Sequence, residues 1–138
     1  VSTLPAFADF AAAFAATMPF AVTNGIEITS VSAEAVVGHV DWAEARCTIG
    51  GLMHGGALMT LSDSLGAVLA FLTLPEGAAG TATVSSNTSL VRGLRDGRAT
   101  GTAVVINAGR RFVAVRTDVV DDTGKLLITT TQVQAVLA

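Results

Sequence analysis

A short motif, His54-Gly55-Gly56, followed by an acid at Asp63, is the part of the sequence best suited to chemistry. The two glycines stand where a long stretch with helical periodicity begins. Each glycine costs a helix about 1 kcal/mol relative to alanine, so another factor must favour both. Backbone N–H groups at a helix start bind anions or a developing oxyanion, helped by the helix dipole. The motif therefore predicts an oxyanion site that a bulky acyl group can approach closely.

Asp63 lies on the helix that this motif begins. Helical phasing puts it opposite the apolar stripe, on a face of small and uncharged residues that comprises Gly56, Met59, Thr60, Ala67 and Ala70. Such a face suits close packing, and packing removes water from a carboxylate, which disfavours its charge and increases its reactivity. We therefore interpret Asp63 as a catalytic acid, with a buried structural aspartate that caps a neighbouring element as the alternative.

Gly55 and Asp63 are eight residues apart, which is roughly 12 Å along one helix. A carbonyl held at the Gly55 N–H is therefore out of reach of Asp63 on the same helix. A two-fold dimer whose central helices run antiparallel would bring Asp63 of one subunit to Gly55 of the other and create two equal sites.

The elements that must position these residues follow from periodicity and turn signals. We expect a short helix over residues 4–17 with Phe7, Phe10 and Phe14 as packing positions, then strands over 26–31 and 35–42. A long helix over 54–74 carries an apolar stripe that consists of Leu58, Leu61, Leu65, Val68, Leu69 and Leu72. Strands over 81–91, 98–106, 111–120 and 126–136 are separated by turn signals such as Asp96-Gly97, which predicts a four-strand antiparallel meander. His39 is out of phase with the apolar positions of its strand, which favours a surface position.

Length and composition place these elements in one α+β domain, residues 1–138, with the N-terminal helix within 1–20 and the core within 26–138. An apolar helix laid against a curved antiparallel sheet is the expected architecture. The chain is 51% hydrophobic and only 14% charged, against about 25% charged in an average soluble domain. So little charge favours a large subunit interface and a homo-oligomer.

Several function classes are disfavoured by the same counts. The net charge of −3 gives no electrostatic case for nucleic acid, and no run reaches the roughly 18–20 clean apolar residues of a membrane helix. A single cysteine, Cys47, forms no internal disulfide and suggests a reducing, cytoplasmic location. His39 and His54 lack the spacing of metal ligands, so we expect no metal.

The stretch Gly51-Leu52-Met53-His54-Gly55-Gly56-Ala57-Leu58, followed by Leu61-Ser62-Asp63, resembles the hotdog-fold acyl-CoA thioesterases. More narrowly, it is similar to their phenylacetate-degradation branch and to relatives that act on hydroxybenzoyl-CoA and long-chain acyl-CoA. The resemblance covers residues 26–138. It implies a long central helix wrapped by a five- or six-stranded antiparallel sheet, and hydrolysis of an acyl-CoA or aryl-CoA to the free acid and coenzyme A. It also implies a dimer as the minimal active unit, commonly a homotetramer, and no cofactor, since coenzyme A enters as part of the substrate.

The resemblance also implies roles for the motif residues. The Gly55 N–H would polarise the thioester carbonyl, and Gly56 would let the substrate approach. Asp63 of the partner subunit would act as nucleophile or general base, two roles that stay open here. His54 would shape the loop and help to place the thioester.

Two further positions follow from the family pattern. A small hydroxyl residue on the strand after the helix often assists catalysis, and Thr83 or its neighbour Ser85 matches that position. Members commonly carry Asn or Gln six residues before the His, where this chain has Thr48. A threonine hydroxyl can hold a water but offers fewer donors than an amide.

Six of the eight basic residues lie between Arg92 and Arg116. In the family, basic residues near these positions line the nucleotide groove, so Arg92, Arg95, Arg110 and Arg111 are candidates for the coenzyme's phosphates. The alternative is that they serve turns and surface salt bridges.

Two other functions stay open at this point. A non-catalytic acyl-CoA-binding subunit of the same fold is supported by Thr48, and a thioesterase that acts on an acyl-carrier-protein thioester would differ only at the coenzyme end. A hotdog hydratase fits His54-Gly55-Gly56 poorly, because that chemistry needs a His paired with an acid in another arrangement.

Overall fold

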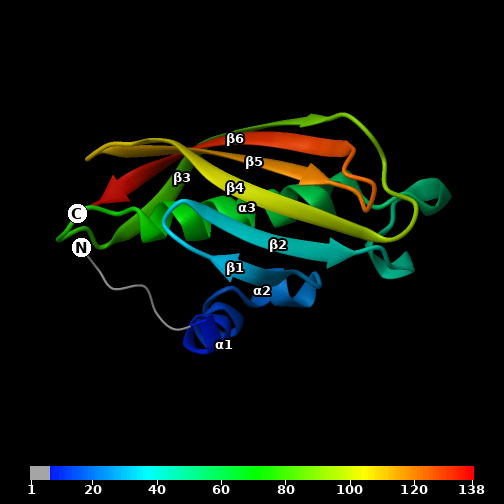
Figure 1. Cartoon of the computed structure of the whole chain (residues 1–138), viewed down its shortest axis with the longest axis horizontal. Helices are drawn as coiled ribbons and strands as arrows, with labels where there is room; N and C mark the ends of the chain where they lie inside the picture. Colours follow the sequence, from blue (N-terminus) through cyan, green and yellow to red (C-terminus); the bar gives the residue numbers. More distant parts are fainter. Residues whose placement is uncertain (1–6) are drawn as a thin grey trace.

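The computed structural model describes residues 7–138 (Figure 1). The elements in chain order are α1 (Phe7–Thr17), α2 (Pro19–Thr23), β1 (Glu27–Val31), β2 (Ala35–Asp41), the 3-10 turns η1 (Glu44–Arg46) and η2 (Ile49–Gly51), α3 (Gly55–Leu72), β3 (Gly80–Leu90), β4 (Arg98–Ala108), β5 (Phe112–Val120) and β6 (Leu126–Leu137). The α+β class that the sequence predicts is confirmed.

All six strands form one antiparallel sheet in the order β1-β2-β4-β5-β6-β3. The sheet curves around α3, which runs along its inner face, while α1 and α2 lie beside β1 (Figure 1). The long central helix and the six-stranded sheet are therefore as expected. By length and composition α3 is also the one helix in residues 7–138 that could span a membrane, but it is mostly buried inside the fold.

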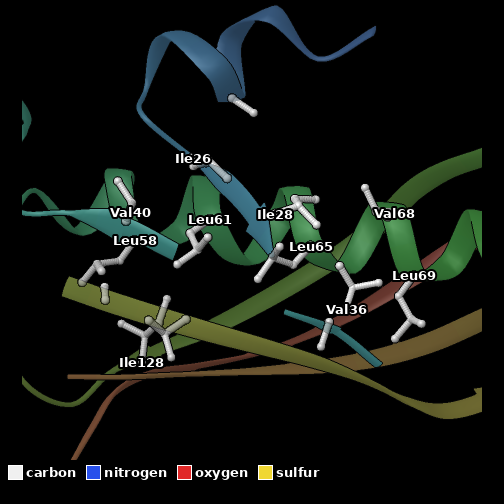
Figure 2. Close-up of a cluster of buried hydrophobic side chains, with 14 of the residues drawn as sticks. Ile26, Ile28, Val36, Val40, Leu58, Leu61, Leu65, Val68, Leu69 and Ile128 are labelled. Carbon is white, nitrogen blue, oxygen red and sulfur yellow. The ribbon is translucent and has the colours of Figure 1, made fainter. Parts of the chain in front are cut away.

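The apolar stripe of α3 forms the centre of the core. Leu58, Leu61, Leu65 and Leu69 are all fully buried against the sheet, where they meet Val36, Val40 and Ile128 among others (Figure 2). Burial of each leucine contributes about 2 kcal/mol through removal of apolar surface from water. The predicted stripe is confirmed, except that Leu72 at the last turn is only partly buried.

Two glycines let the helix approach the sheet at its middle. Gly38 on β2 and Gly101 on β4 are paired across the strands, and both face Leu65. A Cβ at either position would lie 2.7 Å from a methyl group of Leu65. The pair thus leaves room for Leu65, which fixes how close α3 and its candidate site residues lie to the strands.

The prediction of a four-strand meander is wrong for its first strand, β3. β3 pairs with β6 at the far edge and not with β4, so residues 91–97 cross the end of the sheet. The N–H groups of Val91 and Arg92 both donate to the carbonyl of Leu127, and Leu94 is buried in the crossover. Asp96-Gly97 does turn the chain, but it delivers β4 to β2. A local turn signal reports that the chain bends, and not which strand it then joins.

His39 is buried, in contrast to the surface position expected from strand phase. Its Nε2 lies 3.3 Å from a carboxylate oxygen of Glu27 on the neighbouring strand β1, and its Nδ1 lies 3.9 Å from Asp41. Strand alternation identified the face correctly as opposite to Val36 and Val40, but alternation carries no information about what covers that face.

The N-terminal helix is observed as α1, and the predicted residues Leu4, Pro5 and Ala6 and the side chain of Phe7 lie outside the described part. Phe14 is buried and Phe10 packs against the core, which confirms the packing role of these two positions. A second short helix, α2, begins at Pro19 and carries the chain past the middle of α3.

Candidate active site

His54 caps the start of α3 with its side chain. Its Nδ1 accepts a hydrogen bond from the N–H of Gly56 at 2.8 Å, and its carbonyl accepts from Ala57 at 2.9 Å. A neutral imidazole that accepts at Nδ1 carries its proton on Nε2. The imidazole of His54 therefore satisfies the N–H of Gly56. Its own Nε2–H remains available as a donor on the exposed surface.

The N–H of Gly55 is left free by this arrangement. As the first residue of α3 it has no carbonyl one turn earlier to bond, and within residues 7–138 no other acceptor reaches it. A Cβ on Gly55 would lie 2.9 Å from a methyl group of Leu90, so the Leu90 side chain lies beside this first turn of the helix. One unpaired donor at the positive end of an 18-residue helix is the requirement for oxyanion binding.

The loop before His54 is fastened at several points. The N–H of His54 donates to the backbone carbonyl of Arg46, and the N–H of Thr48 donates to the backbone carbonyl of Leu52, both at 2.8 Å. Arg95 donates from its guanidinium to the carbonyl of Gly50 at 3.0 Å. Arg95 therefore holds the loop, while Thr48 is exposed beside it.

Asp63 projects from the middle of α3 toward β6. Its Oδ1 accepts a hydrogen bond from Nε2 of Gln132 at 3.0 Å, and Gln132 itself is fully buried. Asp63 is exposed in the single chain, although neighbouring groups of the fold partly surround its carboxylate. Removal from water raises the pKa of Asp63 above its ordinary value, as its sequence surroundings predicted.

Asp63 also borders a cavity of about 610 Å³ between α2, α3 and β3. The cavity is lined by apolar side chains and by hydroxyl side chains, among them Met18, Phe20, Met59, Thr60, Ser86 and Thr88. No lining residue other than Asp63 carries a charge. A mixed apolar and hydroxyl lining next to a carboxylate suits the acyl part of an ester more than a polyanion.

Gly55 and Asp63 do not meet within one chain. Both belong to the uninterrupted helix α3, so the distance along its axis is roughly 12 Å. The described residues of a single subunit thus hold an oxyanion donor and a carboxylate at separate places.

The strand β3 presents its hydroxyl groups differently from the expectation. Thr83 pairs with Gln134 and accepts a hydrogen bond from that amide at 2.7 Å. A bulge at Val84 then shifts the register, so Ser85 pairs with Val133 on the outer face of the sheet, away from α3. Ser86 and Thr88 are the β3 hydroxyl residues at the Asp63 cavity.

The candidate arginines divide between the two ends of the sheet. Arg92 and Arg95 lie in the crossover near His54, whereas Arg110 and Arg111 lie in the β4–β5 turn near the end of α3. Arg92, Arg110 and Arg111 are exposed and form no ion pair within the described residues. Arg98, in contrast, binds Asp41 through two hydrogen bonds, which lower the pKa of that carboxyl.

No three His, Cys, Asp or Glu side chains in residues 7–138 gather into a possible metal site. Cys47 is half-buried, and its thiol lies 3.3 Å from the carbonyl of Ala43.

Sequence reasoning missed Gln132, Ser86, Thr88 and the α2 wall of the cavity. A glutamine such as Gln132 in phase with buried positions of its strand was a visible signal, since a buried amide needs a partner. Its partner was not visible, because Asp63 lies 69 residues earlier in the chain.

A family model described as "Thioesterase superfamily" matches residues 50–128, which is more than half of the chain. The match includes the His54-Gly55-Gly56 motif, Asp63, the whole of β3 to β5 and the first residues of β6.

Known proteins with similar sequence and structure agree with this match. The 1,4-dihydroxy-2-naphthoyl-CoA hydrolase of Escherichia coli is 31% identical over 87 residues, which cover 63% of each chain. A thioesterase from Haemophilus influenzae has the same fold, with a TM-score of 0.89 at 21% identity over 98% of this chain and 92% of that one. A mutant of the phenylacetic acid degradation protein of Thermus thermophilus gives a TM-score of 0.78 at 26% identity over 87% and 99% of the two chains.

Proposed function

This chain, which belongs to the thioesterase superfamily, is a thioester hydrolase. We propose that its substrate is an acyl- or aryl-coenzyme A and that the substrate binds between two subunits. The observation that carries the proposal is the unpaired Gly55 N–H at the start of α3, with a carboxylate, Asp63, eight residues later whose pKa is raised by partial burial. An oxyanion donor and a poised carboxylate are what acyl transfer from a thioester needs.

The two groups act on one substrate when two helices α3 pack antiparallel about a two-fold axis. Such a dimer would cover exposed apolar residues on α3, on β3 and directly after β3. These residues are Met59, Val84, Leu90 and Val91. Most of β3 is exposed, and it lies at an edge of the sheet with one neighbour. These features support a dimer as the active unit; the pairing of two dimers into a tetramer and a cytoplasmic location stay predictions.

In the proposed reaction, negative charge develops on the thioester oxygen, and the site must stabilise it. The thioester oxygen accepts a hydrogen bond from Gly55, whose N–H and helix dipole stabilise the negative charge as the carbonyl carbon becomes tetrahedral. Asp63 of the partner subunit attacks that carbon or takes a proton from the attacking water. In either route the C–S bond breaks, the thiolate of coenzyme A leaves and gains a proton, and water supplies the oxygen of the free acid.

The antiparallel arrangement also brings cations toward the coenzyme. Arg110 and Arg111 lie toward the end of their own α3, and in this pairing that end extends roughly 13 Å past the start of the other subunit's helix, which lies beside Asp63. Arg92 lies near the start of α3. Both groups of arginines would thus approach the same site, where the phosphates of coenzyme A need positive charge.

A panel of thioesters tests the substrate. We expect thiol release from coenzyme A esters of bulky acyl groups, such as benzoyl and phenylacetyl, with kcat/KM about 10-fold or more above that for acetyl-CoA, because the 610 Å³ cavity beside Asp63 is far larger than an acetyl group. The same acyl groups on an acyl-carrier protein serve as the second arm. A preference for the carrier protein would contradict the coenzyme assignment, and no release from any thioester would overturn the proposed function.

The pH profile should fall on the acid side at a higher pH than an ordinary aspartate would give. Burial raises the pKa of Asp63, and the reaction needs its ionised form, so activity is lost as pH falls through that raised pKa. Steady-state kcat/KM measured between about pH 4 and about pH 8 reports this limb. A profile that stays flat down to the ordinary range of aspartate would contradict the desolvated site.

A further inference from the structure

The inner face of β6 is polar where α3 covers it. Thr130, Gln132 and Gln134 alternate along this face, and each is at most 2% exposed. Thr130 shares a hydrogen bond with Thr88, and Gln134 donates to Thr83, so both have partners on β3. Gln132 also faces β3, at Ser86, but its amide reaches the other way, to Asp63 on the helix.

The helix carries a gap that admits this amide. Gly66 lies three residues after Asp63, so the two share one face of α3. A Cβ on Gly66 would overlap Oε1 of Gln132 and would lie 3.2 Å from a methyl group of Val115. Only a glycine at this position leaves the Gln132 side chain room to lie along the helix and reach Asp63.

The amide has one orientation that suits the site. With Nε2 toward Asp63 it donates to the carboxylate, and Oε1 then faces Gly66 without a hydrogen-bond donor. A buried carbonyl oxygen without a partner costs stability, so the contact with Asp63 is retained at a structural cost. The reverse orientation would place two oxygens against each other unless Asp63 were protonated.

We propose that Gln132 is a positioning residue for thioester hydrolysis, seated by Gly66: its amide holds Oδ1 of Asp63 and favours the ionised carboxylate, which leaves Oδ2 for the reacting centre. The inference rests on the proposed function of Asp63. No charged side chain from α2, α3 or β3 lines this cavity besides Asp63, and the Gln132 amide donates the one side-chain hydrogen bond that Asp63 receives within residues 7–138.

The substitution Gln132→Met tests the role, because methionine keeps the length of the side chain and removes the donor. We expect kcat/KM at neutral pH to fall by roughly 10- to 100-fold, and the acid limb of its pH profile to move up by about one to two pH units. Gln134→Met is the matched control: it removes an equally buried amide from the same face of β6, two residues away, without touching Asp63. Its acid limb should stay where the parent has it.

Gly66→Ala supplies a second route to the same result, since the added methyl group displaces the Gln132 amide and leaves its chemistry intact. A readout independent of turnover is the carboxyl carbon of Asp63, followed by NMR in protein labelled with 13C-aspartate. Its titration midpoint should rise in Gln132→Met and Gly66→Ala and stay unchanged in Gln134→Met.

The outcomes separate this inference from the function on which it rests. If Asp63→Asn is inactive while Gln132→Met keeps the parent pH limb and the parent titration midpoint, the positioning role is wrong and the proposed function stands. If Asp63→Asn is as active as the parent, the proposed function fails. A midpoint that rises equally in Gln134→Met would assign the effect to general packing and overturn the role of Gln132.

Discussion

Replacement of Asp63 by asparagine should lower kcat/KM for the preferred thioester by roughly 100- to 10,000-fold, and by more if Asp63 is the nucleophile. Asparagine has the shape of aspartate, and its side-chain oxygen can still accept the hydrogen bond from Gln132. The variant therefore removes the base or nucleophile with little change in packing. The measurement is initial-rate thiol release, after size-exclusion chromatography has shown that variant and parent have the same oligomeric state.

The same variant should be at least as stable as the parent at neutral pH. Burial raises the pKa of Asp63, so its ionised form is less favourable in the folded chain than in the unfolded chain. This penalty acts above the raised pKa and disappears as pH falls below the pKa of the unfolded chain. We therefore expect the Tm of Asp63→Asn to equal or exceed that of the parent at neutral pH, and the two to converge in acid. A large drop in Tm would show that Asp63 is a structural residue, the alternative that its sequence position left open.

The sequence could predict the features that depend on residues close together along the chain. The helix α3 follows from its apolar stripe, and the cap at its start joins His54 to Gly56, two residues apart. The free Gly55 N–H is a consequence of the same local geometry. Because both catalytic candidates lie on one regular helix, the rise per residue alone gives their separation, and a single substrate that needs both would then need a second subunit.

What the sequence could not predict depends on contacts between distant residues. The edge position of β3 is decided by pairing with β6 across about 50 residues, and the bulge at Val84 decides that Ser86 and not Ser85 faces α3. The alternation of polar and apolar residues within one strand gives no information about such a register shift. The contact of Gln132 with Asp63 likewise depends on the depth of the helix in the sheet, which Gly38, Gly66 and Gly101 set together.

Removal of the Gly55 N–H should be almost as damaging as the loss of Asp63. Gly55→Pro deletes this donor, and we expect a fall of about 100- to 1000-fold in rate. Proline is tolerated at the first position of a helix, and the backbone of His54, with φ −58 and ψ 132, already has the conformation that precedes proline. Gly55→Ala is the control, because it keeps the N–H and adds only a Cβ against the flexible end of Leu90.

Mixing the two inactive variants should then restore activity. In a hybrid dimer of Asp63→Asn and Gly55→Pro subunits, one site combines the intact Gly55 of one chain with the intact Asp63 of the other, and the second site lacks both. Random assembly from equal amounts leaves about one quarter of all sites complete, since each site needs two independent matches of about one half. This fraction is unchanged if dimers pair into tetramers.

The experiment requires coexpression of the variants with two different tags and purification of the doubly tagged species. Recovery to about half of the parent activity per hybrid dimer is expected, against a background of at most about 1% for either variant alone. Because the two residues lie on one helix, a site within a single subunit would gain nothing from the exchange. Hybrids that stay at background would therefore refute the shared site even if each single variant is inactive, and the carboxylate and the oxyanion donor would then have to serve different steps or different ligands.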